Sequence, residues 1–209
     1  MSETRLKILD TAERLFSEQG YAPVSLRHIT AAAGVNLAAI HYHFGSKEEL
    51  LYELVMRKAA PVNEERLATL QRLREAAGAN PLALEDLLEA FLLPAIHTAE
   101  NSPAFAKLMG RLYGEGLMQE VARKHFGPAA ERFLAEMRRT LPDLAEDELS
   151  WRLHFMLGAM AYTLAISPLG LLGRTGPESP SRVARRIVAF LSGGFRAPVA
   201  AREKVEVSE

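Results

Sequence analysis

The chain has 209 residues, of which 48% are apolar and 24% are charged, and its formal net charge is −1. It is long enough to bury a sizeable core, and its net charge alone indicates no polyanionic partner. Cysteine is absent, which excludes disulfides, thiolate zinc sites and cysteine nucleophiles and fits a reducing cytoplasm. The charged first ten residues lack the apolar stretch of a signal peptide, so we expect a cytoplasmic protein.

Helical periodicity dominates the sequence and predicts an all-α fold. An amphipathic helix is expected over residues 3–19. Ser25 is placed to cap a short second helix and Asn36 a short third one, with Gly34 breaking the chain between them. Ser46 then begins the run Ser-Lys-Glu-Glu, a capping box that opens a fourth helix.

Proline marks two positions in the rest of the chain. Pro61 predicts a kink or a boundary, after which residues 63–77 resume a helical pattern. Ser102 followed by Pro103 is a helix start signal. Residues 155–172 are uncharged, but glycine and proline interrupt them, so we expect a buried helix and no membrane span. The remaining helices are expected at residues 84–100, 103–113, 117–140, 146–167 and 181–196, with a break or bend at Gly127-Pro128.

Charge is distributed unevenly along the chain. Residues 21–47 contain no Asp or Glu, although the whole chain has 26 acidic residues. A surface free of carboxylates favours the approach of phosphates, because no negative charge repels them there. The alternative is that acidic residues are missing from this segment by chance. The basic and imidazole side chains within this segment are Arg27, His28, His41, His43 and Lys47.

The spacing of His41 and His43 raises the question of a metal site. Residues two apart on a helix point about 200° apart, so these imidazoles cannot share one ion as an i, i+4 pair does. Two short helices joined by a glycine turn instead form the helix-turn-helix pattern, whose second helix enters the major groove of DNA. Ile40 and Phe44 share one face and would dock that helix on its scaffold. The histidines then either donate hydrogen bonds to phosphates or are solvated or bonded locally.

The run TAERLFSEQGYAPVSLRHITAAAGVNLAAIHYHFGSKEELLYELV resembles the DNA-binding domain of the TetR family of transcriptional regulators. The resemblance implies an N-terminal three-helix helix-turn-helix domain, residues 1–48, followed by a helical ligand-binding and dimerisation domain, residues 49–196. Residues 197–209 are expected to be a disordered tail. The residues that the resemblance implies as DNA contacts are Ser25, Arg27, Leu37, Ala38, Ala39, His41, Tyr42, His43 and Lys47.

Two features depart from the usual pattern of the family. Tyrosine is most frequent where this chain has His41, so a phosphate contact there would come from imidazole or from Tyr42. Leu37 and the two alanines after it cannot hydrogen-bond base edges but can meet thymine methyl groups, and Leu37 is alternatively part of the core. Arg27 is the side chain suited to pair with guanine, and DNA shape would supply further specificity.

The segment ELSWRLHFMLGAMAYTLA, residues 148–165, is apolar nearly all round its helix, which requires burial on more than one side. The family's C-terminal domain forms the dimer, so one face would pack inside the subunit and another against a symmetric partner. The alternative for each candidate interface residue is that it is buried in the core of its own subunit. The candidate interface residues are Trp151, Phe155, Tyr162, Val183, Ile187, Phe190, Leu191 and Gly194.

Methionine and aromatic residues offer flexible lining for an apolar cavity, although most such residues are ordinary core. The segment WRLHFMLGAMA also resembles fatty-acid-responsive, PsrA-like members of the family, which implies a fatty acid or acyl-CoA effector. Arg111, Arg152 and His154 either meet an anionic head group or form solvent or interface salt bridges. The candidate ligand-binding residues are Phe91, Met109, Tyr113, Met118, Phe126, Phe155, Met156 and Met160.

The sequence therefore predicts a homodimeric, ligand-responsive DNA-binding regulator, a repressor released from a palindromic operator by a small hydrophobic effector. An enzyme is not expected, because the chain has no catalytic motif such as GxSxG or HExxH and indicates no cofactor or metal. The alternative is an all-α carrier of hydrophobic ligands without sequence-specific DNA binding. It leaves the carboxylate-free segment unexplained.

Overall fold

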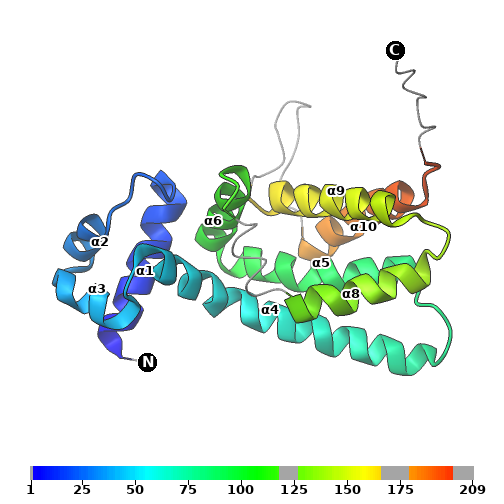
Figure 1. The fold of residues 1–209 in the computed structure, drawn as a ribbon, viewed down its shortest axis with the longest axis horizontal. Coiled ribbons are helices and arrows are strands. Elements are labelled where there is room, and N and C mark those ends of the chain that lie inside the picture. Colours follow the sequence, from blue (N-terminus) through cyan, green and yellow to red (C-terminus); the bar gives the residue numbers. More distant parts are fainter. Residues whose placement is uncertain (1, 118–126, 166–178, 200–209) are drawn as a thin grey trace, which may run out of the picture.

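A computed structural model describes residues 2–117, 127–165 and 179–199. Within these ranges all regular structure is helical, which confirms the predicted fold class. Figure 1 shows α1, α2 and α3 at one end of an elongated molecule, with the long α4 leading away from them. The helices are α1 (Glu3–Gln19), α2 (Leu26–Ala33), α3 (Leu37–Phe44), α4 (Lys47–Ala77), α5 (Leu84–Asn101), α6 (Pro103–Gly114), α8 (Gly127–Thr140), α9 (Glu146–Ala165) and α10 (Pro180–Arg196).

Side-chain caps begin the short helices where the sequence predicts them. The Ser25 hydroxyl accepts a hydrogen bond from the His28 amide, and the Asn36 side chain accepts one from the Ala39 amide. Each cap satisfies an N–H group that has no partner within its helix. Gly34 ends α2 with φ 63°, a left-handed conformation that glycine adopts without steric cost. The turn between α2 and α3 is therefore fixed by local chemistry.

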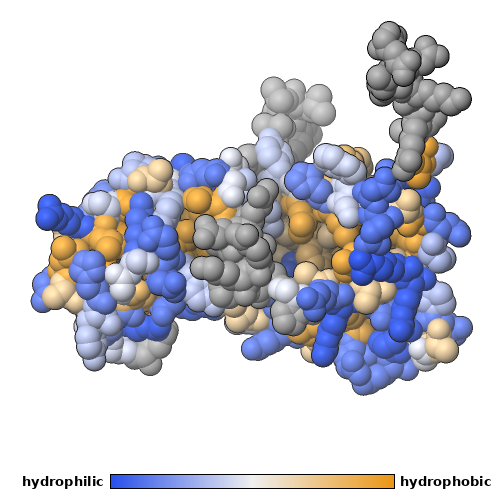
Figure 2. All heavy atoms as spheres, viewed as in Figure 1, coloured by the Kyte–Doolittle hydropathy of each residue, from blue (hydrophilic) through white to orange (hydrophobic). Residues whose placement is uncertain are grey.

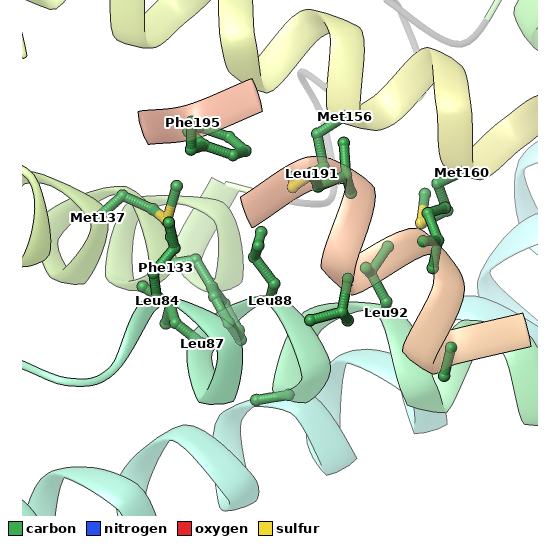
Figure 3. Packing of buried hydrophobic residues seen from close by; sticks show 14 of the residues in the cluster. Leu84, Leu87, Leu88, Leu92, Phe133, Met137, Met156, Met160, Leu191 and Phe195 are labelled. Atoms are coloured by element: carbon green, nitrogen blue, oxygen red, sulfur yellow. The ribbon is translucent and has the colours of Figure 1, made fainter. Parts of the chain in front are cut away.

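The buried residues form two hydrophobic clusters. The N-terminal cluster joins α1, α2 and α3 to the first half of α4 and to the buried face of α6. The C-terminal cluster joins α5, α8, α9 and α10, with Leu70 contributed by α4. Figure 3 shows Leu191 and Phe195 of α10 pointing in among leucines of α5 and Met156 of α9. Helix α4 contributes residues to both clusters, and α6 packs against α1 on one side and α9 on the other, so these two helices link the two ends of the molecule.

Pro61 does not form a boundary, contrary to one of the two predicted alternatives. Helix α4 runs unbroken through it, although an internal proline removes one hydrogen bond and costs about 3 kcal/mol. Buried residues on both sides hold the helix together: Val55 and Ala59 lie in the N-terminal cluster, and Leu70 lies in the C-terminal one. Tertiary packing thus overrides the local signal.

Two other helix predictions change in detail. The helix expected at residues 117–140 is described only from Gly127, the first residue of α8, because residues 118–126 lie outside the described ranges. The break or bend expected at Gly127-Pro128 therefore stays a prediction. Pro103 is the first residue of α6, as predicted, but the Ser102 side chain makes no capping bond. Its hydroxyl instead accepts a hydrogen bond from the Lys58 ammonium at 3.0 Å. Among the described residues, no helix is both long and apolar enough to cross a membrane.

Gly110 sets how closely α6 approaches α9. A Cβ added there would lie 2.1 Å from the Ala165 Cβ atom, far inside any real contact. We therefore expect Gly110→Ala to lower the free energy of unfolding by about 1–3 kcal/mol, the range typical of overpacking. Chemical denaturation measures this change. Gly114→Ala in the same helix meets open space and serves as the control, and an equal effect of the two substitutions would contradict the close packing.

Candidate nucleic-acid interface and internal cavity

Helix α3 docks through two large side chains, as its sequence predicts. Ile40 and Phe44 are buried in the N-terminal cluster, and Ala39 packs against that cluster. Ile29 and Ala33 bury the inner side of α2 in the same way. The remaining side chains of α3 are left at or near the surface.

The predicted DNA contacts lie on this surface with different degrees of exposure. Arg27, Ala38 and His41 are exposed, and Tyr42 has 86% of its surface accessible. Ser25 is also exposed, but its hydroxyl already caps α2. Three further predicted contacts are half-buried: Leu37, Ala39 and His43. The structure thus brings the predicted residues of α2 and α3 together at one end of the molecule.

The two histidines of α3 have local partners. The Nδ1 atom of His41 lies 3.0 Å from the Gly45 carbonyl oxygen and donates to it, since a carbonyl only accepts. This contact uses Nδ1 of the His41 ring and does not involve Nε2. The His43 ring makes edge contacts with the rings of Tyr42 and Phe44. Within the described ranges, no cluster of three or more potential ligands could hold a metal ion.

Lys47 is tied to the loop between α1 and α2. Its ammonium donates to the carbonyl oxygens of Tyr21 at 2.7 Å and Ala22 at 3.3 Å, and it lies 4.1 Å from the centroid of the Tyr21 ring. Burial lowers the pKa of this ammonium from its ordinary value. Two of its three N–H groups are therefore used within the chain, so Lys47 positions the start of α2 as well as offering one donor outward.

A cavity of about 310 Å³ lies among α4, α5, α6, α8 and α9. Its wall is mostly apolar, and hydrophobic residues reach the surface between α8 and α9 on the face shown in Figure 2. The volume is at the lower end of the roughly 300–1,000 Å³ typical of ligand pockets. Five of the predicted ligand-binding residues line it, namely Phe91, Met109, Tyr113, Met156 and Met160.

Of the other three predicted ligand-binding residues, the structure describes one, and that residue lies outside the wall. Phe155 is 60% exposed and lies on the outer side of α9, so its assignment to the cavity is wrong. The reason is helical phase: Met156 and Met160 are one turn apart on the inner face, and Phe155 points about 100° away from Met156. Met118 and Phe126 fall outside the described residues.

Arg66 is a cavity residue that was not predicted from the sequence. It is only 5% exposed, and its Nε atom donates to the Phe91 carbonyl oxygen at 2.7 Å. Burial lowers the pKa of its guanidinium to about 10. The burial of Arg66 could have been predicted from its spacing. Val62, Arg66 and Leu70 lie one turn apart on the same face of α4, and all three are buried. An arginine inside an apolar stripe is the signal that was overlooked.

The three cationic residues considered for an anionic head group lie elsewhere. Arg111 donates to the Glu18 carbonyl oxygen at the end of α1, at 3.0 Å. Arg152 is buried between α9 and the end of α10, and His154 is exposed on α9 beside Trp151. None of the three lines the cavity.

The candidate dimer residues separate into three groups. Ile187 and Leu191 are buried in the C-terminal cluster of their own chain, so they follow the intramolecular alternative. Val183 is half-buried and Gly194 is exposed. The remaining four are large side chains with 50–74% of their surface accessible: Trp151, Phe155, Tyr162 and Phe190. We call these four residues the outer apolar face.

Comparisons with known proteins agree with both ends of the molecule. Residues 8–54 match the family "Bacterial regulatory proteins, tetR family", and residues 89–194, just over half of the chain, match "Tetracyclin repressor-like, C-terminal domain". The regulator AcrR of Shigella flexneri is 52% identical over 52 residues, which are 25% of this chain and 24% of that protein. SrpR of Pseudomonas putida is 29% identical over 140 residues, 66% of this chain and 60% of that protein.

These matches span between a quarter and three fifths of the two relatives' own lengths. Among solved structures, a tetR family regulator from Shewanella sp. PV-4 superposes with a TM-score of 0.62 at 21% identity, covering 92% of this chain and 98% of that one. That likeness shows a shared fold. Together with the two family matches and the helix-turn-helix geometry, it leads to one conclusion: the chain belongs to the TetR family of transcriptional regulators.

Proposed function

We propose that this chain is a dimeric repressor that binds a palindromic operator through α3 and releases it when a small apolar molecule enters the cavity. The observation that carries the proposal is α6, which belongs to both ends of the molecule. Its buried residues Phe105, Leu108 and Leu112 lie in the N-terminal cluster, while Met109 and Tyr113 line the cavity. The proposal keeps the division into residues 1–48 for DNA and residues 49–196 for ligand and dimer.

Recognition of DNA would use the exposed side of α2 and α3. Arg27 extends from α2, and Tyr42 from α3 is almost fully exposed. His41 already donates from Nδ1 to Gly45, so it reaches a phosphate as a donor only when Nε2 is also protonated. Lys47 would act mainly by holding the loop before α2. Specificity then rests on Arg27 and on DNA shape, because Ala38 and Ala39 offer base edges only methyl groups.

Dimerisation would use the outer apolar face. Trp151, Phe155 and Tyr162 follow i, i+4 and i+11 spacing along one side of α9, and Phe190 is exposed on α10. Exposed aromatic residues gathered in this way are typical of interfaces between subunits. A symmetric pair would place the two α3 helices roughly 34–36 Å apart, one turn of duplex DNA.

Ligand control would pass through α6. Arg111 of α6 donates to the Glu18 carbonyl oxygen, and the side chain of Glu115, the residue directly after α6, lies beside Gly20. A ligand that changes the position of α6 therefore changes that of α1, which carries α2 and α3. The ligand lowers operator affinity only as far as it prefers the released arrangement.

The experiment that tests this proposal is selection of binding sites from a random DNA library, followed by titration at several salt concentrations. We expect enrichment of a palindrome and a steep loss of affinity as salt rises. A carrier of hydrophobic ligands would enrich no sequence. Addition of an apolar ligand should then release the operator, and a protein that selects an operator but never releases it would contradict ligand control alone.

Arg27 and Lys47 are expected to differ in how they affect binding. Arg27→Ala should relax the preference at one base-pair position by about 1–3 kcal/mol, because a side chain that pairs with a base discriminates among bases. Lys47→Ala should weaken all sequences about equally, because its contacts fix the α1–α2 loop. Titration against single-base variants of the operator measures both. Arg72→Ala, exposed on the far half of α4, is the control, and equal effects of Arg27→Ala on every sequence would contradict its role.

A further inference from the structure

We propose that the cavity takes a monocarboxylate with an apolar body, and that Arg66 binds its carboxylate. The inference rests on the proposed function only in treating the cavity as the effector site. Arg66 is the single charged side chain among the described residues of the wall. Among the described residues of the wall there is no Asp or Glu, and within the same ranges Arg66 forms no ion pair.

The hydrogen bonds of Arg66 orient its guanidinium and leave donors over. Nε donates to the Phe91 carbonyl oxygen at 2.7 Å, and Nη1 donates to the Asn63 side chain at 3.2 Å. Nη2 meets only the Met160 sulfur, a weak acceptor, at 3.8 Å. The guanidinium carbon lies 3.9 Å from the centroid of the Phe91 ring, which covers one face. A guanidinium has five N–H groups, so the two terminal nitrogens keep donors for a ligand.

The energetics favour an anion at this position. A buried cation without a counter-charge has lost its hydration and gained only neutral acceptors in return. Burial lowers the pKa of Arg66 to about 10, so the group is still charged at neutral pH. A carboxylate matches the planar fork of a guanidinium and forms short, charge-assisted hydrogen bonds with it. An anionic ligand therefore supplies the acceptor and the charge that the apolar wall does not.

Tyr113 supports the same placement from the opposite helix. It lines the cavity from α6, and burial raises the pKa of its hydroxyl while the charge of Arg66 lowers it by a smaller effect. The two groups thus lie within electrostatic reach of one another. A neutral phenol is a hydrogen-bond donor that can join Arg66 at one carboxylate.

Charge and volume limit the ligand class further. One cation matches one negative charge, and a cavity of about 310 Å³ with an otherwise apolar wall matches an alkyl or aryl body. A phosphate-rich ligand would bring several charges into a wall that offers one partner. The described wall therefore favours a simple carboxylic acid over a polyphosphate.

The test compares acids with alcohols of the same chain length. Calorimetric titration without DNA would use octanoate, dodecanoate and hexadecanoate against 1-octanol, 1-dodecanol and 1-hexadecanol. We expect the natural chain to bind at least one acid about tenfold or more tightly than its alcohol. Arg66→Met should lose that preference, with acid affinity falling about 10- to 100-fold and alcohol affinity unchanged. Arg66→Lys keeps the charge without the fork, and we expect part of the preference to remain.

Controls separate binding from folding and from regulation. Arg72→Met removes an exposed arginine of the same helix and should keep the full preference for acids. Circular dichroism establishes that each variant is folded, and the acid-to-alcohol ratio of the natural chain decides the matter even if Arg66→Met does not fold. Equal affinity for acid and alcohol, or binding of neither, overturns the inference. If an acid binds through Arg66 but leaves the operator bound, ligand control fails and the inference stands.

Discussion

A chain carrying both Phe155→Glu and Phe190→Glu is expected to be a folded monomer that has lost operator affinity by about 100-fold or more. Each substituted side chain is more than half exposed in the single subunit, so a carboxylate there can remain hydrated in the monomer. In a dimer the same carboxylates would be buried without partners, which strongly disfavours association. Each subunit then binds its half-site independently. The gain in affinity from joining two subunits, typically 10²–10⁴-fold, is lost.

Sedimentation velocity measures the oligomeric state, and titration against a full palindrome and a half-site measures the loss of joint binding. The matched control is Ala68→Glu with Ala76→Glu, which adds the same charge at exposed positions on α4. This control should remain dimeric and keep its affinity apart from a general effect of charge. A double variant that is still dimeric would show that the outer apolar face is not the interface.

The second large expected effect is a loss of about 2–4 kcal/mol in the free energy of unfolding for Arg152→Met. Arg152 is 6% exposed and joins α9 to the end of α10. Its Nη1 atom donates to the carbonyl oxygens of Gly194 at 3.0 Å and Phe195 at 2.7 Å, and its Nε atom donates to Glu148 at 2.7 Å. Methionine fills similar space but leaves these acceptors without their donor, and each buried unsatisfied group costs about 1–3 kcal/mol.

Denaturation at several protein concentrations measures this loss, because the proposed dimer would make apparent stability depend on concentration. Arg138→Met is the control: Arg138 pairs with Glu146 at the surface, where solvent screens the two charges and the ion pair adds little to stability. Arg152→Met should therefore unfold at clearly lower denaturant concentration than Arg138→Met. Equal stabilities would mean that water replaces the guanidinium between α9 and α10.

The helix-turn-helix was predictable because its signals are local. Ser25 and Asn36 cap α2 and α3 through their own side chains, and Ile40 and Phe44 dock α3 through one-turn spacing. The proline signals were less reliable. Pro61 breaks a helix by local rules, yet α4 continues through it because packing on both sides stabilises one long helix. Such packing depends on residues far away in the sequence.

The cavity and the outer apolar face also combine features that the sequence predicts with features that depend on tertiary packing. Periodicity indicated that α9 buries more than one side, but only the tertiary structure decided that Met156 lines the cavity and Phe155 lies outside. It also placed Ile187 and Leu191 in their own subunit's core, because α5 packs against that side of α10. The sequence determines which residues share a face of a helix. It does not show which neighbouring helix packs against each face.

The sequence by itself therefore determined the all-α class, the family resemblance and the small DNA-binding unit, since caps, turns and short-range periodicity act within a few residues. Only the tertiary structure decided that Lys47 is held by the Tyr21 and Ala22 carbonyls and that Arg66 is enclosed beside Phe91 and Tyr113. A lysine or arginine is the same residue in the sequence whether its charge is solvated or buried. Its chemistry is set by groups from distant helices that folding brings around it.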